Sequence, residues 1–420
     1  MNILIRHIRG LVQVREEVPS VISGRSMGEL PVLTDAWLSI RDGWIAGFGP
    51  MQSLPQSEVE SAGEVIDASG KFVFPSWCDS HTHLVFAGSR EQEFADRISG
   101  LTYEEIAARG GGILNSVQRL ASTTEDELYA AAYERLNEMM FLGTGAVEIK
   151  SGYGLDLENE LKMLRVIRRL GEHHPLTIRA TFLGAHAVPL AFKGNREGYV
   201  DYLLREILPA VKSEGLADFI DVFCEKNYFT VEDTERILEA GAAHGLEGKV
   251  HVNQFNVLGG VAACVKHRAR SVDHLEWVSD EDIEALKGAV TLPVALPGCS
   301  LFIGIPYTPA RRIIDAGLPL ALATDYNPGS APSGNMNLVM SLGCIQMKMT
   351  PEEVFNAATI NGAYAMNVHH ALGHIRLGAK ANVFISREMN SLAHVPYSFG
   401  SNPVETVILN GKVMHAPPKN

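Results

Sequence analysis

The stretch Val73-Phe74-Pro75-Ser76-Trp77-Cys78-Asp79-Ser80-His81-Thr82-His83 runs from apolar, strand-like residues into a pair of histidines. Residues i and i+2 of a β-strand point to the same face, so His81 and His83 present both imidazoles to one side. An apolar strand that ends in polar side chains buries them at a cost in free energy unless its end opens into a site. We therefore predict a site at the carboxyl end of this strand.

Seven further apolar, strand-like runs follow, and helical stretches lie between several of them. Alternating strands and helices indicate parallel β/α units, and eight such units favour a closed (β/α)8 TIM-like barrel with its site at the carboxyl ends of the strands. A doubly wound open sheet is the alternative, disfavoured because no G-x-G-x-x-G motif follows the first strand. The eight runs end at His83, Lys150, His186, Cys224, His251, His274, Leu296 and Asp325. The clearest helical stretches are 126–140, 158–170, 230–244 and 280–286.

Both ends of the chain have the pattern of short β-strands. The first two strands alternate in hydropathy around Asp42-Gly43, which is typical of a hairpin turn. We predict a small β-sandwich domain formed by residues 1–75 and 376–420, with the barrel in residues 76–375. The expected strands are 36–40 paired with 44–48, 65–68 paired with 71–75, and then 381–385, 404–409 and 410–413.

Composition and charge exclude several classes of protein. The 420 residues include 36 Lys and Arg against 49 Asp and Glu, and the net charge of −13 disfavours binding to nucleic acid or to an anionic membrane. Five widely spaced cysteines without a C-x-x-C pair argue against a disulfide framework and a structural zinc module. The N-terminus lacks the apolar core of a signal peptide, and the uncharged residues 289–310 contain helix-breaking prolines. We therefore predict a cytoplasmic protein with no membrane segment.

Polar residues also end three later strands. His251 ends the fifth run, His274 the sixth and Asp325 the eighth. One such residue is often a satisfied core residue, but the carboxyl ends of barrel strands meet at one rim, so we expect these side chains to converge. Three imidazoles and one carboxylate suit zinc or iron and leave one coordination position open for water.

This arrangement, flanked by β-rich termini, resembles the metal-dependent amidohydrolase superfamily. Within that superfamily, more specific strings resemble the imidazolonepropionases of histidine degradation. The resemblance runs from about residue 79 to residue 351 and is weaker at the ends. The strings are residues 79–86 with 88–90, 102–106 through 110–113, 148–155, 182–186 and 323–329.

The resemblance implies a hydrolase that opens the ring of 4-imidazolone-5-propanoate, a small-molecule substrate, to give N-formimidoyl-L-glutamate. It also implies one Zn²⁺ or Fe³⁺ ion per chain and a homodimer. The implied metal ligands are His81, His83, His251 and Asp325. The implied substrate contacts are Arg90, Tyr153, His186, Gln254, Asn327, Gly329 and Ser330, and His274 matches a catalytic histidine beside the metal.

The chemistry of these residues is consistent with such roles. Arg90 can pair bidentately with the propionate carboxylate. Asp325 can take a proton from a water whose pKa the metal lowers, and His274 can relay or orient it. His186 can polarise the ring carbonyl or hold the oxyanion.

Three departures from the family pattern bear on the function. Gln254 stands where many deaminases of the superfamily have Glu, and an amide cannot shuttle a proton. Ser330 stands where the family usually has Thr, and Pro75-Ser76-Trp77-Cys78 replaces small and aliphatic residues. We expect Cys78 to point away from the metal. The fourth run contains no lysine that could be carbamylated to bridge a second metal, although Lys226 lies just beyond it.

Two other functions remain as alternatives. One is a deaminase-type amidohydrolase acting on another heterocycle, such as a purine or a guanidine. Gln254 and Arg90 speak against it. The other is a non-catalytic barrel that binds a metabolite. Absence of one of the expected metal ligands would have supported that hypothesis, but all four positions are filled.

Overall fold

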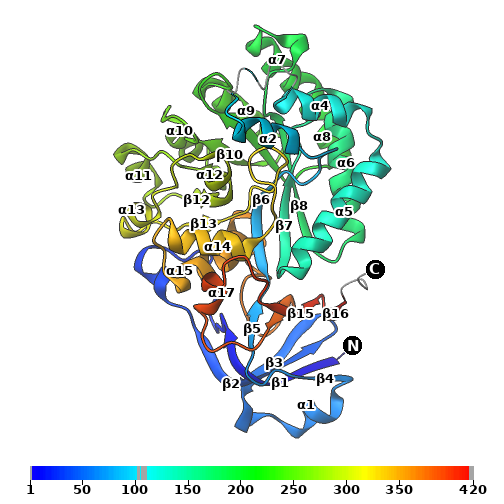
Figure 1. Cartoon of the computed structure of the whole chain (residues 1–420), viewed down its shortest axis with the longest axis vertical. Coiled ribbons are helices and arrows are strands. Elements are labelled where there is room, and N and C mark those ends of the chain that lie inside the picture. The colour runs from blue at the N-terminus through cyan, green and yellow to red at the C-terminus, as the bar shows by residue number, and fades with distance from the viewer. Residues whose placement is uncertain (1, 102–104, 106–110, 416–420) are drawn as a thin grey trace.

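The computed structural model describes residues 2–101, 105 and 111–415, and two sheets organise them (Figure 1). Eight strands form the first sheet in the order β13-β12-β11-β10-β9-β8-β7-β6, and neighbours pair in parallel. An isolated parallel bridge between Thr82 and Tyr326 joins the two ends of this sheet. The predicted barrel is therefore confirmed. Its strands are β6 (Trp77–Thr82), β7 (Thr144–Lys150), β8 (Thr177–Ala185), β9 (Phe219–Cys224), β10 (Glu247–Val252), β11 (Ser271–His274), β12 (Leu292–Ala295) and β13 (Ala321–Leu322).

The four helices expected from the sequence are present as α5 (Glu125–Phe141), α6 (Leu157–His173), α9 (Val231–Ala243) and α11 (Asp280–Leu286). Three of them begin with a capping box, in which a hydroxyl at Thr124, Thr230 or Ser279 accepts the amide three residues on. No helix in the described part of the chain is long and apolar enough to cross a membrane. The other barrel helices are α2 (Glu91–Ile98), α4 (Ile113–Ser122), η3 (Leu190–Phe192), α7 (Arg196–Tyr202), η4 (Leu203–Ile207), α8 (Leu208–Glu214), α10 (Gly260–Lys266), α12 (Pro297–Ile303), α13 (Ala310–Asp315), α14 (Met336–Ile345), α15 (Pro351–Asn356), η5 (Ala357–Asn361) and α16 (Gly362–Ala365).

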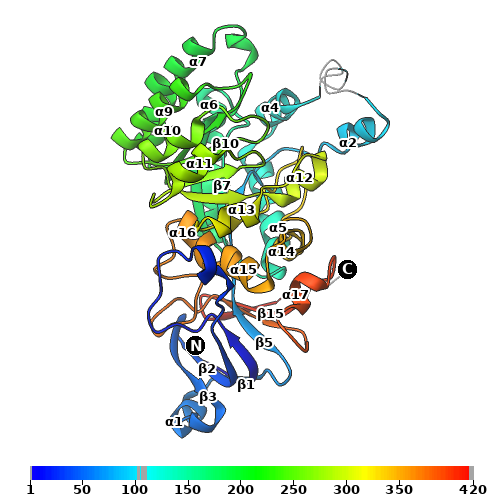
Figure 2. The same ribbon diagram turned by 90° about the vertical axis from the view of Figure 1, so that its left-hand side faces the viewer.

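The second sheet combines both ends of the chain and lies below the barrel in Figure 2. Its order is β16-β15-β14-β5-β1-β2-β3, and β4 branches from β1. The small β domain expected from both termini is therefore present. Its strands are β1 (Asn2–Val12), β2 (Val32–Arg41), β3 (Trp44–Pro50), β4 (Glu64–Asp67), β5 (Phe72–Pro75), β14 (Val383–Ser386), β15 (Val404–Leu409) and β16 (Lys412–Met414). Short helices η1 (Gly24–Gly28), η2 (Met51–Ser53), α1 (Gln56–Ser61) and α17 (His394–Tyr397) complete the chain.

One expected pairing in this sheet is wrong. β4 and β5 do not pair with each other; each pairs in parallel with β1, at Ile3–Arg6 and at Gly10–Leu11 respectively. The intervening residues do not reverse the chain, and the Asp67 carboxylate accepts hydrogen bonds from the amide and hydroxyl of Ser69 within them. The chain therefore continues along β1 in one direction.

The stretch that opens the barrel passes from one sheet to the other at Ser76. Pro75 pairs with Val383 in the terminal sheet, whereas Trp77 pairs with Thr144 in the barrel. The buried Trp77 ring packs against Phe384, with centroids 4.8 Å apart, and fills the junction. The division into residues 1–75 with 376–420 and residues 76–375 stays a prediction.

Candidate metal and substrate site

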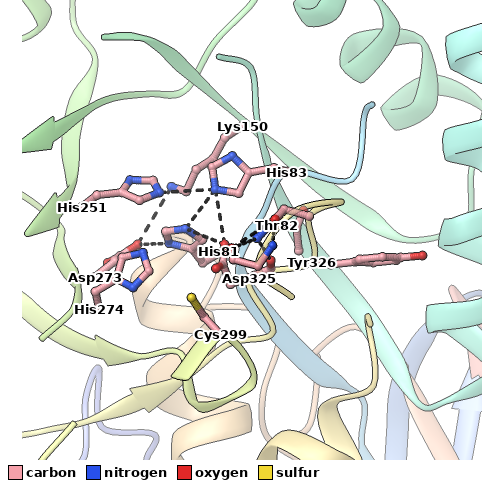
Figure 3. Close-up of polar contacts among 12 residues, drawn as sticks. His81, Thr82, His83, Lys150, His251, Asp273, His274, Cys299, Asp325 and Tyr326 are labelled. Carbon is pink, nitrogen blue, oxygen red and sulfur yellow. Dashed lines mark hydrogen bonds and ion pairs between the residues drawn. The ribbon is translucent and has the colours of Figure 1, made fainter. Parts of the chain in front are cut away.

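Four buried side chains converge at the carboxyl ends of the barrel strands (Figure 3). His81 and His83 lie at the end of β6, and their Nε2 atoms are 3.3 Å apart. The Nε2 atom of His251, from β10, lies 3.3 Å from that of His83. The Oδ1 atom of Asp325, which follows β13, lies 3.4 Å from His83 Nε2 and 3.6 Å from His81 Nε2.

These spacings fit the ligand shell of a metal ion. A tetrahedral zinc ion with ligands at ~2.0–2.1 Å places them about 3.3–3.4 Å from one another. Burial lowers the pKa of His81, His83 and His251 well below the usual value, so each neutral ring keeps a lone pair for a metal. Burial raises the pKa of Asp325 to about 6, which leaves its carboxylate ionised at neutral pH. His81, His83 and Asp325 therefore have the mutual spacing that a metal requires, and His251 joins them through its 3.3 Å approach to His83.

Two carboxylates behind the ligands fix the imidazole rings. Asp273 Oδ2 lies 2.6 Å from His81 Nδ1, and Asp221 Oδ2 lies 2.9 Å from His251 Nδ1. Asp273 can accept the Nδ1 proton of His81, which leaves the Nε2 atom of that ring for a metal. Asp221 lies close enough to His251 Nδ1 to orient that ring in the same sense. Sequence reasoning missed both aspartates. The sequence did contain an indication of both, since each is a charged residue inside a short apolar strand, Asp221 in β9 and Asp273 in β11.

A cavity of about 390 Å³ lies against the predicted metal ligands. Every predicted site residue except His81 lines it, and His81 is fully buried beside it. The structure thus brings the predicted residues together, while their individual roles stay predictions. Further lining residues that the sequence did not single out are Glu93, Arg97, Leu101, Phe223, Tyr228, Phe255, Ile303 and Ile305.

Arg90 is held in place at the cavity wall. Its Nη2 donates to Glu93 Oε2 at 2.5 Å, and the other oxygen of that carboxylate accepts the amide of Gly112 at 3.0 Å. On another side, a Cβ atom added at Gly329 would lie 2.2 Å from Arg90 Nη1. Only a glycine at 329 therefore leaves room for the guanidinium in this position. Sequence reasoning missed Glu93, whose only signal is its i,i+3 spacing from the arginine.

The structure changes the role expected for His186. Its Nδ1 lies 3.0 Å from the carbonyl oxygen of Gly152, which can only accept, so Nδ1 carries the proton. Burial lowers the pKa of His186 to about 4, so the ring is neutral and its Nε2 is an acceptor. An acceptor cannot polarise a carbonyl or hold an oxyanion. The role predicted from the sequence therefore does not agree with this hydrogen bond.

The side chain of Asn327 is used within its own loop. Its Oδ1 accepts the amides of Gly329 and Ser330, both at 2.8 Å. Its Nδ2 donates to the carbonyl of Asp325 at 2.7 Å and to Ser330 Oγ at 2.8 Å. Asn327 therefore shapes the loop that carries Asp325, and its side-chain amide is already engaged within that loop.

Two strand-end residues adopt a left-handed backbone that side chains other than glycine rarely take. The φ angle is +89° at His274 and +56° at Asp325. His274 Nδ1 lies 3.2 Å from Glu276 Oε1, and this carboxylate raises the pKa of His274 although burial alone would lower it. Such strain collects at functional sites, where the surrounding structure holds it. Sequence reasoning missed the role of Glu276.

Gln254 and Tyr153 present polar groups to the cavity from two other strand ends. The Gln254 amide nitrogen donates to Cys299 Sγ at 3.4 Å, which leaves the amide oxygen as an acceptor. Burial raises the pKa of Tyr153, so its phenol stays protonated and can donate. Its ring centroid lies 5.5 Å from that of His186.

Other residues named from the sequence lie away from the predicted metal ligands. Cys78 packs with Ala146, Ala363 and Met366, as expected for a residue pointing out of the barrel. Lys226 is exposed and does not line the 390 Å³ cavity. Residues 102–104 and 106–110, which carry much of the second family string, lie outside the described residues.

Comparison with known proteins gives consistent matches. A model described as the amidohydrolase family matches residues 192–414. The imidazolonepropionase of Christiangramia forsetii is 59% identical over 414 residues, covering 99% of this chain and 100% of that protein. The imidazolonepropionase of Alkaliphilus oremlandii is 41% identical, with coverage of 99% and 98%. A mutant atrazine chlorohydrolase from Arthrobacter aurescens, complexed with zinc and atraton, shares the fold at 16% identity, with a TM-score of 0.68 and coverage of 98% and 94%.

Proposed function

The chain belongs to the imidazolonepropionase family of the amidohydrolases, and from that premise we propose how its cavity performs the family's reaction. It is a hydrolase of histidine degradation that cleaves a carbon–nitrogen bond of a cyclic amide, opening 4-imidazolone-5-propanoate to N-formimidoyl-L-glutamate. The observation that carries the proposed mechanism is a cluster of four donor groups: those of His81, His83 and Asp325 lie 3.3–3.6 Å from one another, and that of His251 lies 3.3 Å from His83, beside a cavity that also holds Arg90.

The family and the clustered ligands support a metal ion in this site. We assign one zinc or iron ion per chain to His81, His83, His251 and Asp325. When bound, such an ion supplies a Lewis acid and lowers the pKa of a water molecule toward ~7. Lys150 argues against a second ion on a carbamate, because its ammonium lies 2.9 Å from a carboxylate oxygen of Asp221 and is a cation there.

Asp325 and His274 are assigned to proton transfer. Asp325 is the one carboxylate among the four donors, so its oxygens are placed to take a proton from the attacking water. His274 keeps its Nδ1 proton on Glu276, so its Nε2 is the atom that passes a proton to the departing ring nitrogen. The water oxygen ends on the carbonyl carbon, and the carbon–nitrogen bond breaks.

The remaining residues orient the substrate. Arg90 takes the propionate carboxylate, and the protonated phenol of Tyr153 donates to the same group. His186 Nε2 accepts a ring N–H, which replaces the carbonyl-polarising role expected from the sequence. The free amide oxygen of Gln254 accepts a second polar hydrogen.

The proposed single-metal mechanism is tested by chelator treatment and stepwise restoration of metal. The full chain should consume 4-imidazolone-5-propanoate, followed as loss of imidazolone absorbance, and should lose this activity after dialysis against a chelator. Activity should return in full at one equivalent of zinc or iron. Full activity in the metal-depleted protein, or a requirement for two equivalents, would overturn the mechanism. We also propose a homodimer, which light scattering of the purified chain would measure.

A further inference from the structure

Five charged side chains form a cluster inside the barrel, behind the proposed metal ligands, and the steps above use none of them as reactants. They are Glu148 and Lys150 on β7, Asp221 on β9, Lys249 on β10 and Asp273 on β11. All are at most 1% exposed. A further buried acid, Asp79 on β6, is hydrogen-bonded to Thr324 instead. The interior of a parallel barrel is ordinarily filled by branched apolar side chains, so buried charges here require an explanation.

Lys150 occupies the centre of this cluster. Its Nζ lies 3.0 Å from Glu148 Oε1, 2.9 Å from Asp221 Oδ2 and 3.9 Å from Asp273 Oδ2. The last two oxygens are the same atoms that hold the imidazoles of metal ligands. Asp221 Oδ2 lies 2.9 Å from His251 Nδ1, and Asp273 Oδ2 lies 2.6 Å from His81 Nδ1. One ammonium group thus lies behind two ligand rings on different strands (Figure 3).

We propose that Lys150 is a positioning residue of the metal site, whose ammonium fixes Asp221 and Asp273 so that His251 and His81 present Nε2 to one point. This inference rests on the proposed metal site. Without the ammonium, two carboxylates in the same buried space would repel each other and rotate apart. Each rotation would turn a ligand ring, because each ring follows its carboxylate.

The cluster contains its own control. Lys249 is as deeply buried as Lys150, but its Nζ donates to Ser271 Oγ at 2.9 Å and to the carbonyl of Ala365 at 3.2 Å. Its ion-pair contact with a described carboxylate is Asp273, at 3.8 Å. Removing Lys249 therefore deletes the same charge from the same core without releasing the Asp221–His251 pair.

The test compares Lys150→Met with Lys249→Met in the full chain after metal removal, using Co²⁺ as the probe. Co²⁺ affinity is measured by competition with a chelator, and the visible absorption bands of bound Co²⁺ report the ligand geometry. We expect Lys150→Met to weaken Co²⁺ binding by about 10–100-fold and to change the bands, as loss of an outer-shell partner does. Lys249→Met removes the 3.8 Å contact with Asp273 but leaves Lys150 on Asp221, so it should weaken Co²⁺ binding less and change the bands less than Lys150→Met. The inference is overturned if Lys150→Met keeps the wild-type affinity and spectrum, or if both variants change alike.

A second variant covers failure of Lys150→Met to fold. Glu148→Gln with Lys150→Met removes one negative and one positive charge, leaves the net charge of the core unchanged, and should show the same weakened Co²⁺ binding. Wild-type binding in this double variant would overturn the inference. None of these measurements needs substrate turnover. Failure of this inference can therefore be told apart from failure of the proposed reaction. Absence of Co²⁺ binding in the wild-type protein would instead refute the metal site itself.

Discussion

Replacing Gly329 by alanine tests whether Arg90 binds the propionate. The new Cβ would lie 2.2 Å from Arg90 Nη1 and 2.8 Å from Cζ, whereas unstrained contacts begin at about 3.5 Å. The guanidinium must therefore move by about 1 Å or more. The atoms in conflict are the end of a flexible side chain, and Gly329 is not among the glycines with positive φ, so we expect the variant to fold normally.

The expected loss follows from the displaced contact. A hydrogen bond to a charged group contributes about 1.5–3 kcal/mol, so kcat/KM for 4-imidazolone-5-propanoate should fall by about 10–150-fold, mostly through KM. Metal content should not change, because neither residue belongs to the proposed ligand set. Gly28→Ala is the control, since a Cβ there meets no atom within 4 Å. Its kinetics should match those of the wild-type enzyme.

A double-mutant cycle makes the test specific. Arg90→Ala should lose about as much as Gly329→Ala, and the double variant should lose little more, because both changes remove one interaction. An imidazolone without the carboxylate should be turned over about equally by all four proteins. Losses that add in the double variant would refute the reasoning, and so would a Gly329→Ala enzyme that keeps the wild-type preference for the propionate.

Three further predictions concern other parts of the molecule. Asp325→Asn should keep part of the metal measured by elemental analysis but lose at least ~100-fold in kcat, since an amide does not accept the proton; near wild-type kcat with metal bound would exclude Asp325 as the base. Glu93→Ala should raise KM about tenfold at constant metal content by releasing Arg90, and an unchanged KM would show that the arginine needs no support. Burial lowers the pKa of His174 to about 4 in the folded protein, where its Nδ1 accepts the amide of Leu176. In the unfolded chain its pKa is near 6.5, so lowering the pH below that value protonates the unfolded chain first and favours it. The free energy of unfolding in urea should therefore fall by about 2 kcal/mol more between pH 7 and pH 4.5 in the wild type than in His174→Gln, and parallel pH curves would contradict this.

The clustering of His81, His83, His251 and Asp325 could be predicted from the sequence because each one ends an apolar run, and a polar strand end can be recognised without knowledge of strand pairing. The same reasoning could not show which imidazole each carboxylate supports. Asp221 reaches His251 from a neighbouring strand, and Asp273 reaches His81 from the opposite part of the barrel. Those distances depend on barrel closure and strand register, which local hydropathy does not encode.

The assignments that changed share a physical cause. His186 and Asn327 were assigned from residue type and position in a motif, but their hydrogen-bonding capacity depends on atoms already engaged by the protein. A carbonyl of Gly152 takes the His186 proton, and the loop of Asp325 takes all four hydrogen bonds of the Asn327 amide. Lys150 of β7 is a different case. Its proposed positioning role follows from its contacts with Asp221 and Asp273, which the sequence does not reveal. A sequence therefore indicates which groups reach a site, whereas the hydrogen bonds each group has already made determine what it can still donate or accept.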